Sequence, residues 1–145
     1  MIHYLKGDVT ELTGFEPKLI IHVCNNKGAW GGGFTGALSK KWKQPEYYYR
    51  RRRRHILGDI QFVQVNEHTN VVNMIAQVLG DKTGVNLRYV ALRQCLYAIR
   101  DYAINHNCTI HAPRFGAGLA GGDWKIIEKM INQILFNVKV YIYNL

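Results

Sequence analysis

The sequence predicts an α/β domain in which helices cover both faces of a central mixed sheet of about six strands, an α/β/α arrangement of three layers. Short apolar runs alternate along the chain with segments in which apolar residues recur at helical spacing. One of these runs, Leu19–Cys24, is almost continuously apolar, which is typical of a strand covered on both faces. Two glycine-rich stretches each lie between such a run and a helical segment, as strand-to-helix turns do in open sheets.

The first part of the chain is predicted to contain two strands and two short helices. Ile2–Leu5 is a short strand ended by a Gly-Asp pair, and Leu19–Cys24 is the buried strand. A helix is expected from about Phe34 to Trp42. Pro45, three residues later, interrupts the helical segment, because proline cannot continue a helical hydrogen-bond ladder. A second helical piece is expected over Glu46–Arg54.

A hairpin is predicted next. Gly58–Val65 alternates between apolar and polar residues like a half-buried strand, and Asn70–Gln77 gives a second strand. The residues from Asn66 to Thr69 form the turn between them.

The last part of the chain is predicted to contain a helix, a strand, a helix and a strand. Apolar residues recur at helical spacing from Leu87 to Tyr102, and Thr109–Ala112 is a short strand. Ile126–Leu135 marks the final helix, for which the Asp123 carboxylate is a suitable N-cap. Val138–Tyr143 closes the sheet.

Length and composition limit the class of protein. The 145 residues fit one domain, and no apolar stretch reaches the ~20 residues that a membrane span needs. The first residues lack the charged and apolar regions of a signal peptide. Cys24, Cys95 and Cys108 are odd in number and widely spaced, so we expect neither a disulfide framework nor a metal site. A cytoplasmic protein without a cofactor is expected.

The net charge of +9 favours polyanionic partners, either nucleic acid or a phosphate-bearing ligand. Much of the charge lies in the run Arg50–Arg54. Such a run is usually a solvated face, and five adjacent arginines in a helix would point in all directions. Electrostatic steering of an anionic ligand is therefore the functional role we expect, with nucleic-acid binding as an alternative.

The glycine-rich stretches point to an anion. Gly28–Gly33 follows the buried strand, and Gly116–Gly122 follows the strand at Thr109–Ala112. Glycine allows close approach of a backbone to a ligand, and consecutive N–H groups at a helix start bind anions. Two such stretches in matching positions suggest that a nucleotide pyrophosphate is bound between them.

Other nucleotide-binding classes are disfavoured. A Walker motif is absent from the sequence, and the Gly-x-Gly-x-x-Gly pattern beginning at Gly116 lacks the acidic residue expected about 20 positions later. Ser/His/Asp catalysis has no candidate, because Ser39 is the only serine and lies within a predicted helix.

Four segments, taken in order, resemble a macro domain. They are Lys6–Thr10, Ile21–Asn26, Gly28–Phe34 and Pro113–Leu119. The resemblance covers nearly the whole chain and is closest to compact standalone macro domains of bacteria and phages. Those macro domains are similar in turn to the yeast ADP-ribose 1″-phosphate phosphatase and to the terminal ADP-ribose glycohydrolase branch. The resemblance implies an ADP-ribose pocket and removal of a substituent from the distal ribose.

The resemblance also implies ligand contacts. Asp8 would accept a hydrogen bond from the adenine amino group, Tyr143 would stack on adenine, and Asn25 would hold the distal ribose. Gly31–Gly33 would embrace that ribose and Gly116–Leu119 would cradle the pyrophosphate. The full implied set is Asp8, Val9, Asn25, Gly31, Gly32, Gly33, Phe34, Arg114, Phe115, Gly116, Ala117, Gly118, Leu119 and Tyr143. Without the resemblance, Asp8 and Asn25 also suit turns, and Tyr143 also suits an edge strand.

His22, Asn25 and Asp123 are the expected catalytic residues. His22 resembles a histidine of the yeast phosphatase, although a histidine in an apolar strand is as often a hydrogen-bonded core residue. Asp123 lies three residues beyond Ala120, which occupies the position of the glycohydrolase aspartate, and it also suits a helix cap. The position of the covalent lysine of that branch holds Gln77, with Lys82 beyond it.

These departures favour ADP-ribose 1″-phosphate phosphatase activity over the covalent-lysine mechanism. Two alternatives remain at this point. One is an ADP-ribosyl hydrolase that acts on modified protein or nucleic acid, and the other is a reader that binds ADP-ribose without turnover.

Overall fold

A single six-stranded sheet organises the computed structural model, which describes residues 2–145, and its strand order is β1-β6-β5-β2-β4-β3. β3 runs antiparallel to β4, and every other neighbouring pair is parallel. The predicted mixed sheet is therefore confirmed. The strands are Ile2–Lys6 (β1), Lys18–Asn25 (β2), Ile60–Asn66 (β3), Thr69–Gln77 (β4), Thr109–Ala112 (β5) and Val140–Asn144 (β6).

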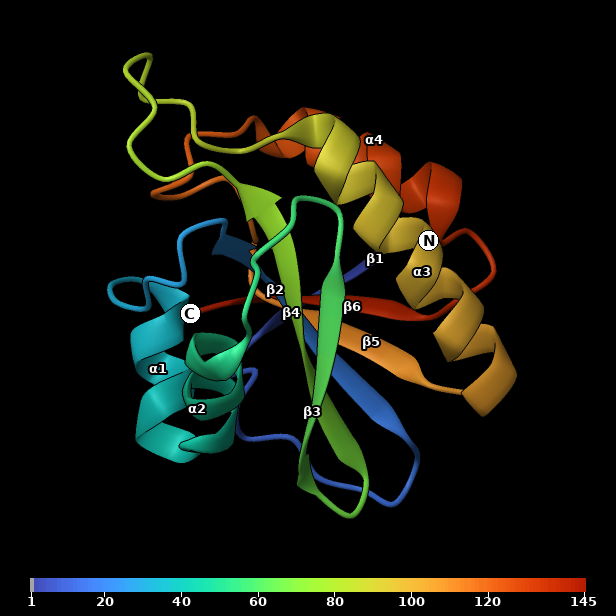
Figure 1. Ribbon diagram of the computed structural model, residues 1–145. Coiled ribbons are helices and arrows are strands. Elements are labelled where there is room, and N and C mark those ends of the chain that lie inside the picture. Colours follow the sequence, from blue (N-terminus) through green and yellow to red (C-terminus); the bar gives the residue numbers. More distant parts are fainter. Residues whose placement is uncertain (1) are drawn as a thin grey trace.

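Helices cover both faces of this sheet (Figure 1). Phe34–Lys41 (α1) and Gln44–Arg51 (α2) lie on one face, while Tyr89–His106 (α3) and Trp124–Ile134 (α4) lie on the other. The three-layer prediction is thus confirmed.

The buried strand β2 shows why both faces need a cover. Leu19 and Ile21 point into the large core beneath α3 and α4. Ile20, between them, points to the opposite face and packs with Leu38 of α1. Because successive side chains of a strand alternate between faces, an apolar run of this length exposes apolar surface unless both sides are covered.

The second helix is shorter than predicted. α2 begins at Gln44 with Pro45 in its first turn, so proline starts this helix and the break falls before it. The helix ends at Arg51 and not at Arg54, because Arg52 already has extended backbone angles. At the helix end the Tyr49 carbonyl accepts from Arg52 N at 3.3 Å and from His55 Nε2–H at 2.7 Å.

The predicted cap of α4 is confirmed, since Asp123 Oδ1 accepts a hydrogen bond from Lys125 N at 2.9 Å. The last strand begins at Val140, two residues later than predicted, because Val138 N still donates to Leu135 O in the turn after α4. The hairpin turn contains only the two residues between β3 and β4.

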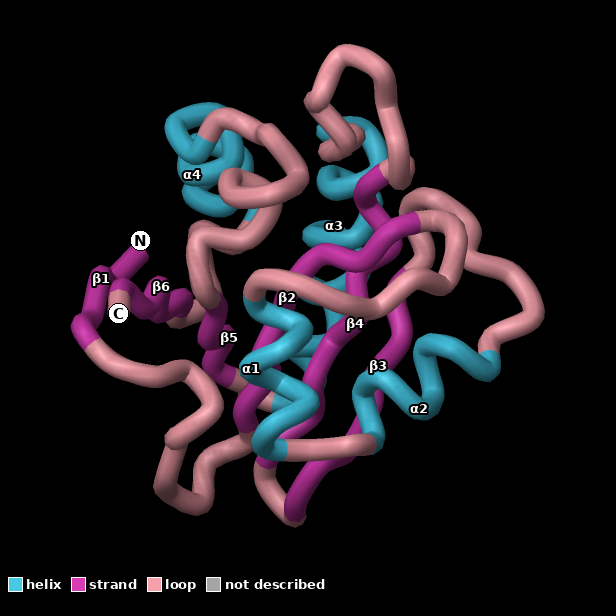
Figure 2. Tube along the Cα trace, turned by 90° about the vertical axis from the view of Figure 1, so that its left-hand side faces the viewer, coloured by secondary structure: helices cyan, strands magenta, loops and turns pink. Residues whose placement is uncertain are grey.

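The carboxyl ends of the parallel strands lie at one edge of the sheet. Both glycine-rich connections, β2 to α1 and β5 to α4, leave from this edge, as Figure 2 shows. Open α/β sheets bind ligands at this edge.

Within residues 2–145, no helix combines the length and the apolar character needed to cross a bilayer. The three cysteines are buried free thiols, and burial raises the pKa of Cys95 to about 12.

Candidate functional site

Two cavities adjoin at the carboxyl edge of the sheet. The first, of about 560 Å³, is lined by the loop after β1, by α1 and by Tyr143, and we call it the Asp8 cavity. The second, of about 610 Å³, is lined by the end of β2 and by both glycine loops, and we call it the Asn25 cavity. Because Gly33, Phe34 and Pro113 line both, the two cavities form one elongated cleft.

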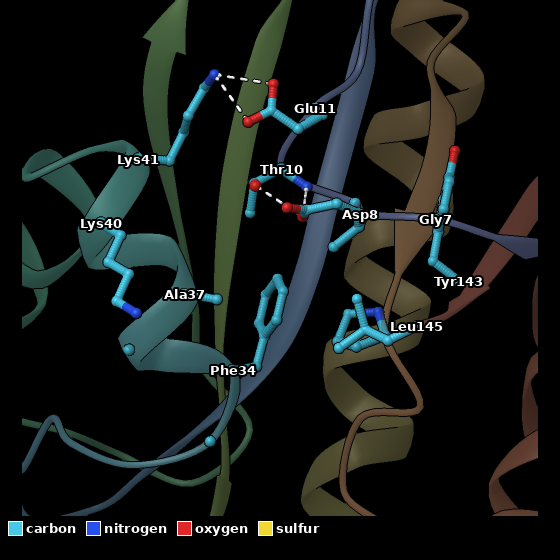
Figure 3. A pocket seen from close by; sticks show the side chains of 14 residues that line it. Gly7, Asp8, Thr10, Glu11, Phe34, Ala37, Lys40, Lys41, Tyr143 and Leu145 are labelled. Carbon is cyan, nitrogen blue, oxygen red and sulfur yellow. Dashed lines mark hydrogen bonds and ion pairs between the residues drawn. The ribbon is translucent and has the colours of Figure 1, made fainter.

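Asp8 presents a carboxylate at the rim of its cavity (Figure 3). Its Oδ1 accepts hydrogen bonds from Thr10 N at 2.8 Å and from Thr10 Oγ1 at 2.7 Å. These bonds from the Thr10 hydroxyl and amide lower the pKa of the exposed Asp8 carboxyl. Asp8 is therefore an ionised carboxylate with a fixed orientation. It can accept a hydrogen bond from the exocyclic amino group of a base.

Tyr143 forms another wall of the Asp8 cavity, and its phenol oxygen lies 2.7 Å from His111 Nδ1. The other ring nitrogen of His111 lies 2.8 Å from Thr109 Oγ1. Burial, with the positive charge of Lys18 nearby, lowers the pKa of His111 to about 4. A neutral imidazole thus joins both hydroxyl groups and fixes the orientation of the Tyr143 ring.

The rim of the Asp8 cavity also carries charge from α1. Lys41 Nζ lies 3.2 Å from Glu11 Oε2 and so links α1 to the loop after β1 (Figure 3). Both groups are exposed, so this ion pair contributes little to stability. Lys40 lines the same cavity.

Asn25 organises the first glycine loop, which comprises residues 28–33. Its Nδ2 donates to Ala29 O at 2.7 Å, and its Oδ1 accepts from Lys27 N at 2.9 Å. The buried Tyr49 hydroxyl lies 2.7 Å from the Asn25 carbonyl and 3.0 Å from Oδ1. Asn25 lines its cavity, but its side chain is used to hold the loop.

Gln77 carries an unsatisfied acceptor in the Asn25 cavity. It ends β4 opposite Asn25, where the register between β2 and β4 shifts. Its Oε1 atom is buried and has no hydrogen-bond partner among residues 2–145. Since buried polar groups are nearly always paired, this oxygen is a candidate for contact with a ligand or a water molecule.

Some glycines of the cleft are not required by the fold. Gly31 and Gly118 have no left-handed backbone angle, and a methyl group on either would meet no protein atom within 4 Å. Gly32 would meet only the Leu119 side chain, at an ordinary 3.5 Å. Glycine at such positions keeps the backbone accessible to a ligand.

Two rows of amide groups lie at the same cleft, one in residues 31–33 and one in residues 116–119, of which only Ala117 does not line it. In the described part of the chain, the N–H groups of residues 116–119 donate to no protein acceptor, nor do those of residues 31–33. The latter lead directly into α1, whose N-cap Gly33 has no side chain to cap it. Free N–H groups at the start of a helix attract anions.

His22 lines the Asn25 cavity but is only 2% exposed. Its Nε2–H donates to Asn73 Oδ1 at 2.6 Å, and its ring packs edge-on against Trp30 and Phe34. Burial lowers the pKa of His22 to about 4, although the hydrogen bond to Asn73 acts in the opposite direction. His22 is thus a neutral, hydrogen-bonded core residue, and its catalytic role stays a prediction.

The structure does not bring every predicted residue to the cleft. Asp123 is exposed at the start of α4 and lines neither cavity. Ala117 packs against the core beneath α3 and α4 and lines neither cavity. The Arg114 guanidinium lies over the Tyr4 and Trp124 rings and donates to Asn144, although the residue lines the Asn25 cavity. The remaining predicted ligand contacts all line the cleft.

Many lining residues were not among the predicted contacts, and Trp30, Gln77 and Pro113 are examples. Gln77 could have been found from its place at the end of a predicted strand, next to the strand that carries Asn25. Trp30 gives no such signal, because a large aromatic residue in a loop is as readily buried as exposed.

Comparisons with known proteins agree on the fold. No protein-family model matches the chain. A solved protein of unknown function from Bacteroides thetaiotaomicron is 43% identical, covers 100% of this chain and 98% of its own, and has a TM-score of 0.93. A macrodomain protein from Streptomyces coelicolor is 37% identical over 100% of this chain and 99% of its own, with a TM-score of 0.85.

A relative with a named activity is more distant. The ADP-ribose 1″-phosphate phosphatase of Candida albicans is 26% identical over 155 aligned positions, which cover 97% of this chain and 99% of the yeast protein.

Proposed function

The chain belongs to the macrodomain family, and from this premise we propose that its cleft binds ADP-ribose and hydrolyses ADP-ribose 1″-phosphate. The observation that supports this most directly is the chemistry of the cleft from end to end. An oriented carboxylate lies at one end, two rows of free amides lie in the middle, and an unsatisfied acceptor lies at the other end.

The adenosine part of the ligand fits the Asp8 cavity. The Asp8 carboxylate is an acceptor for the adenine amino group, and the Tyr143 ring, held by His111, offers an aromatic surface beside it. The diphosphate then reaches the amides of residues 116–119 and the start of α1, where N–H groups and the helix dipole favour negative charge. The net charge of +9 attracts such a ligand at long range.

The distal ribose would occupy the Asn25 cavity, close to Gln77. Hydrolysis of the 1″-phosphate adds water across the phosphorus–oxygen bond and yields ADP-ribose and inorganic phosphate. The Gln77 Oε1 atom has free capacity to accept a hydrogen bond from the attacking water and so to orient it. The first glycine loop, fixed by Asn25, would supply N–H groups to the phosphate oxygens.

Calorimetry with ADP-ribose tests the binding step. We expect Asp8→Ala to weaken binding by about tenfold to a hundredfold, because a charge-assisted hydrogen bond is lost. Asp101→Ala, which removes an exposed carboxylate from α3, is the matched control and is expected to bind as the natural chain does. Failure of the natural chain to bind ADP-ribose would overturn the proposal.

Phosphate release from ADP-ribose 1″-phosphate tests the chemical step. We expect Gln77→Leu to slow turnover and to leave ADP-ribose affinity within a few-fold. His22→Gln and Asn25→Ala, checked for folding by circular dichroism, test the predicted catalytic roles of those residues in the same assay.

A reader of ADP-ribose is the second candidate. It is favoured by two observations. His22 lines the Asn25 cavity but is buried and neutral, and Asp123 lies outside both cavities. Tight binding with no phosphate release would support this reader over the phosphatase.

A further inference from the structure

A basic and aromatic surface lies on and just after α2, outside the cleft. Its exposed side chains are Lys43, Tyr47, Tyr48, Arg51, Arg53 and Arg54, and we call this set the α2 surface. The ligand-binding role proposed above uses none of these residues.

The five consecutive arginines divide into two groups. Arg50 pairs with Glu46 at 2.8 Å and also donates to the Trp30 carbonyl at 3.1 Å, while Arg52 pairs with Asp59 at 3.4 Å. Arg51, Arg53 and Arg54 are exposed and have no carboxylate within ion-pair distance in the described part of the chain. Three cations are therefore available to a partner, while two hold the structure.

Two tyrosines lie among these cations. Tyr47 and Tyr48 are 50% and 51% exposed, and their rings are perpendicular with centroids 5.1 Å apart. The Arg51 guanidinium lies 4.3 Å from the Tyr47 ring centroid. Exposed rings combined with unpaired cations are what a single-stranded nucleic acid needs, because its bases stack while its phosphates are neutralised. An acidic peptide would use the cations but not the rings.

The helix that carries this surface is attached to the cleft at the Asn25 cavity. Arg50 binds the carbonyl of Trp30, and the Tyr49 hydroxyl binds Asn25, so α2 is attached to the first glycine loop. The His55 ring packs on Tyr49 and blocks the space beside Gly28. Figure 2 shows α2 beside α1, on the side of the molecule from which the β2–α1 connection arrives.

We propose that the α2 surface binds a single-stranded nucleic acid through its unpaired arginines and exposed tyrosines. This inference does not rest on the proposed function, because none of these residues lines the cleft. The surface and the cleft can therefore fail separately.

Fluorescence anisotropy with a labelled oligothymidylate of about 16 nucleotides tests the surface. We expect the natural chain to bind, with affinity that falls as salt rises from about 50 to 200 mM. The triple variant R51A/R53A/R54A should reduce the slope of log affinity against log salt by about 2, because three phosphate contacts are lost. The variant K125A/K129A/K139A removes the same charge from the opposite side and should keep the natural slope.

The tyrosines are tested in the same assay. Y47L/Y48L should lower oligothymidylate affinity by about tenfold or more, because base stacking is lost. Y97L, which removes a similarly exposed tyrosine lying beneath Arg100 on α3, is the matched control. A duplex of the same length should bind the natural chain more weakly than the single strand.

Several outcomes would overturn the inference. These are absence of oligonucleotide binding, an equal loss in the α4-side lysine variant, and preference for polyglutamate over the oligonucleotide. ADP-ribose binding with no oligonucleotide binding would remove this inference and leave the proposed function. Oligonucleotide binding with no ADP-ribose binding would remove the proposed function and leave this inference.

Discussion

The two glycine loops look alike in sequence, yet they have different relations to the fold. In the second loop, residues 116–122, a methyl group on Gly121 would lie 2.6 Å from Gly84 O, and one on Gly122 would lie 2.5 Å from Gly116 O. In the first loop, residues 28–33, a methyl group on Gly31 would meet nothing and one on Gly32 only a flexible leucine. The second loop therefore needs most of its glycines to fold, while the middle of the first does not.

This difference teaches how to separate structural glycines from ligand-binding ones. A left-handed backbone angle or a clash with backbone atoms gives a glycine a structural reason. A glycine with neither reason, on a cavity wall, leaves the backbone open to close approach by a ligand. Gly31 and Gly118 meet that description, one in each loop.

The largest expected effect is on stability in the second loop. Gly121→Ala combines a left-handed backbone angle of φ +73° with a backbone clash, so we expect a loss of roughly 2–4 kcal/mol in the free energy of unfolding. Chemical denaturation measures this loss. Gly118→Ala should stay within about 0.5 kcal/mol of the natural chain. Equal stability losses in both variants would break the comparison.

Low pH should destabilise the packing around the first loop, because the His22 ring packs against Trp30 in that loop and against Phe34, which follows it. The pKa of His22 is about 4 in the fold and near 6.5 when unfolded, so the unfolded chain takes up the proton first as pH falls. Stability is therefore complete above about pH 6.5 and falls towards pH 4, by up to about 3 kcal/mol from this residue. His111, with its pKa also lowered to about 4, adds a loss of the same sign.

Denaturation curves collected across this pH range measure the acid effect. In His22→Gln the dependence should be shallower than in the natural chain. An unchanged slope would mean that folding does not lower the pKa of His22.

A smaller effect is expected on ligand affinity from the glycines without a structural reason. Gly118→Ala and Gly31→Ala should each weaken ADP-ribose binding by about tenfold, because a methyl group would occupy space beside the amides. Their unfolding free energies should remain near that of the natural chain. Calorimetry gives the affinities, and natural binding by both variants would show that the open positions are not ligand contacts.

The smallest effect is expected at Asp123, just beyond the second loop. Asp123→Ala removes the hydrogen bond to Lys125 N, and the loss of a helix cap costs about 1 kcal/mol of stability. Thermal denaturation measures this loss. The same variant decides the predicted catalytic role, since a fall in phosphate release beyond the fall in folded protein would restore it.

Much of the fold could be predicted from the sequence, because strand and helix periodicities are local signals. β2 and the Asp123 cap lie where the residues indicated. The end of α2 could not be predicted, since it depends on His55 folding back onto the Tyr49 carbonyl. The partners of two arginines were equally unpredictable. Arg50 binds the carbonyl of Trp30, which is 20 residues away in the sequence, and Arg52 pairs with Asp59 across the turn after α2.

The same division applies to the candidate site. The sequence by itself placed the two glycine loops at the carboxyl ends of strands, where open α/β sheets bind ligands. The ligand role expected for Asp8 came from the resemblance to a macro domain. Only the tertiary structure decided which groups face the cleft. It buried His22 against Asn73, used the Asn25 amide to hold a loop, and left the Gln77 oxygen without a partner. The physical reason is that burial and hydrogen-bond pairing depend on neighbours brought together by folding, which no local pattern of residues records.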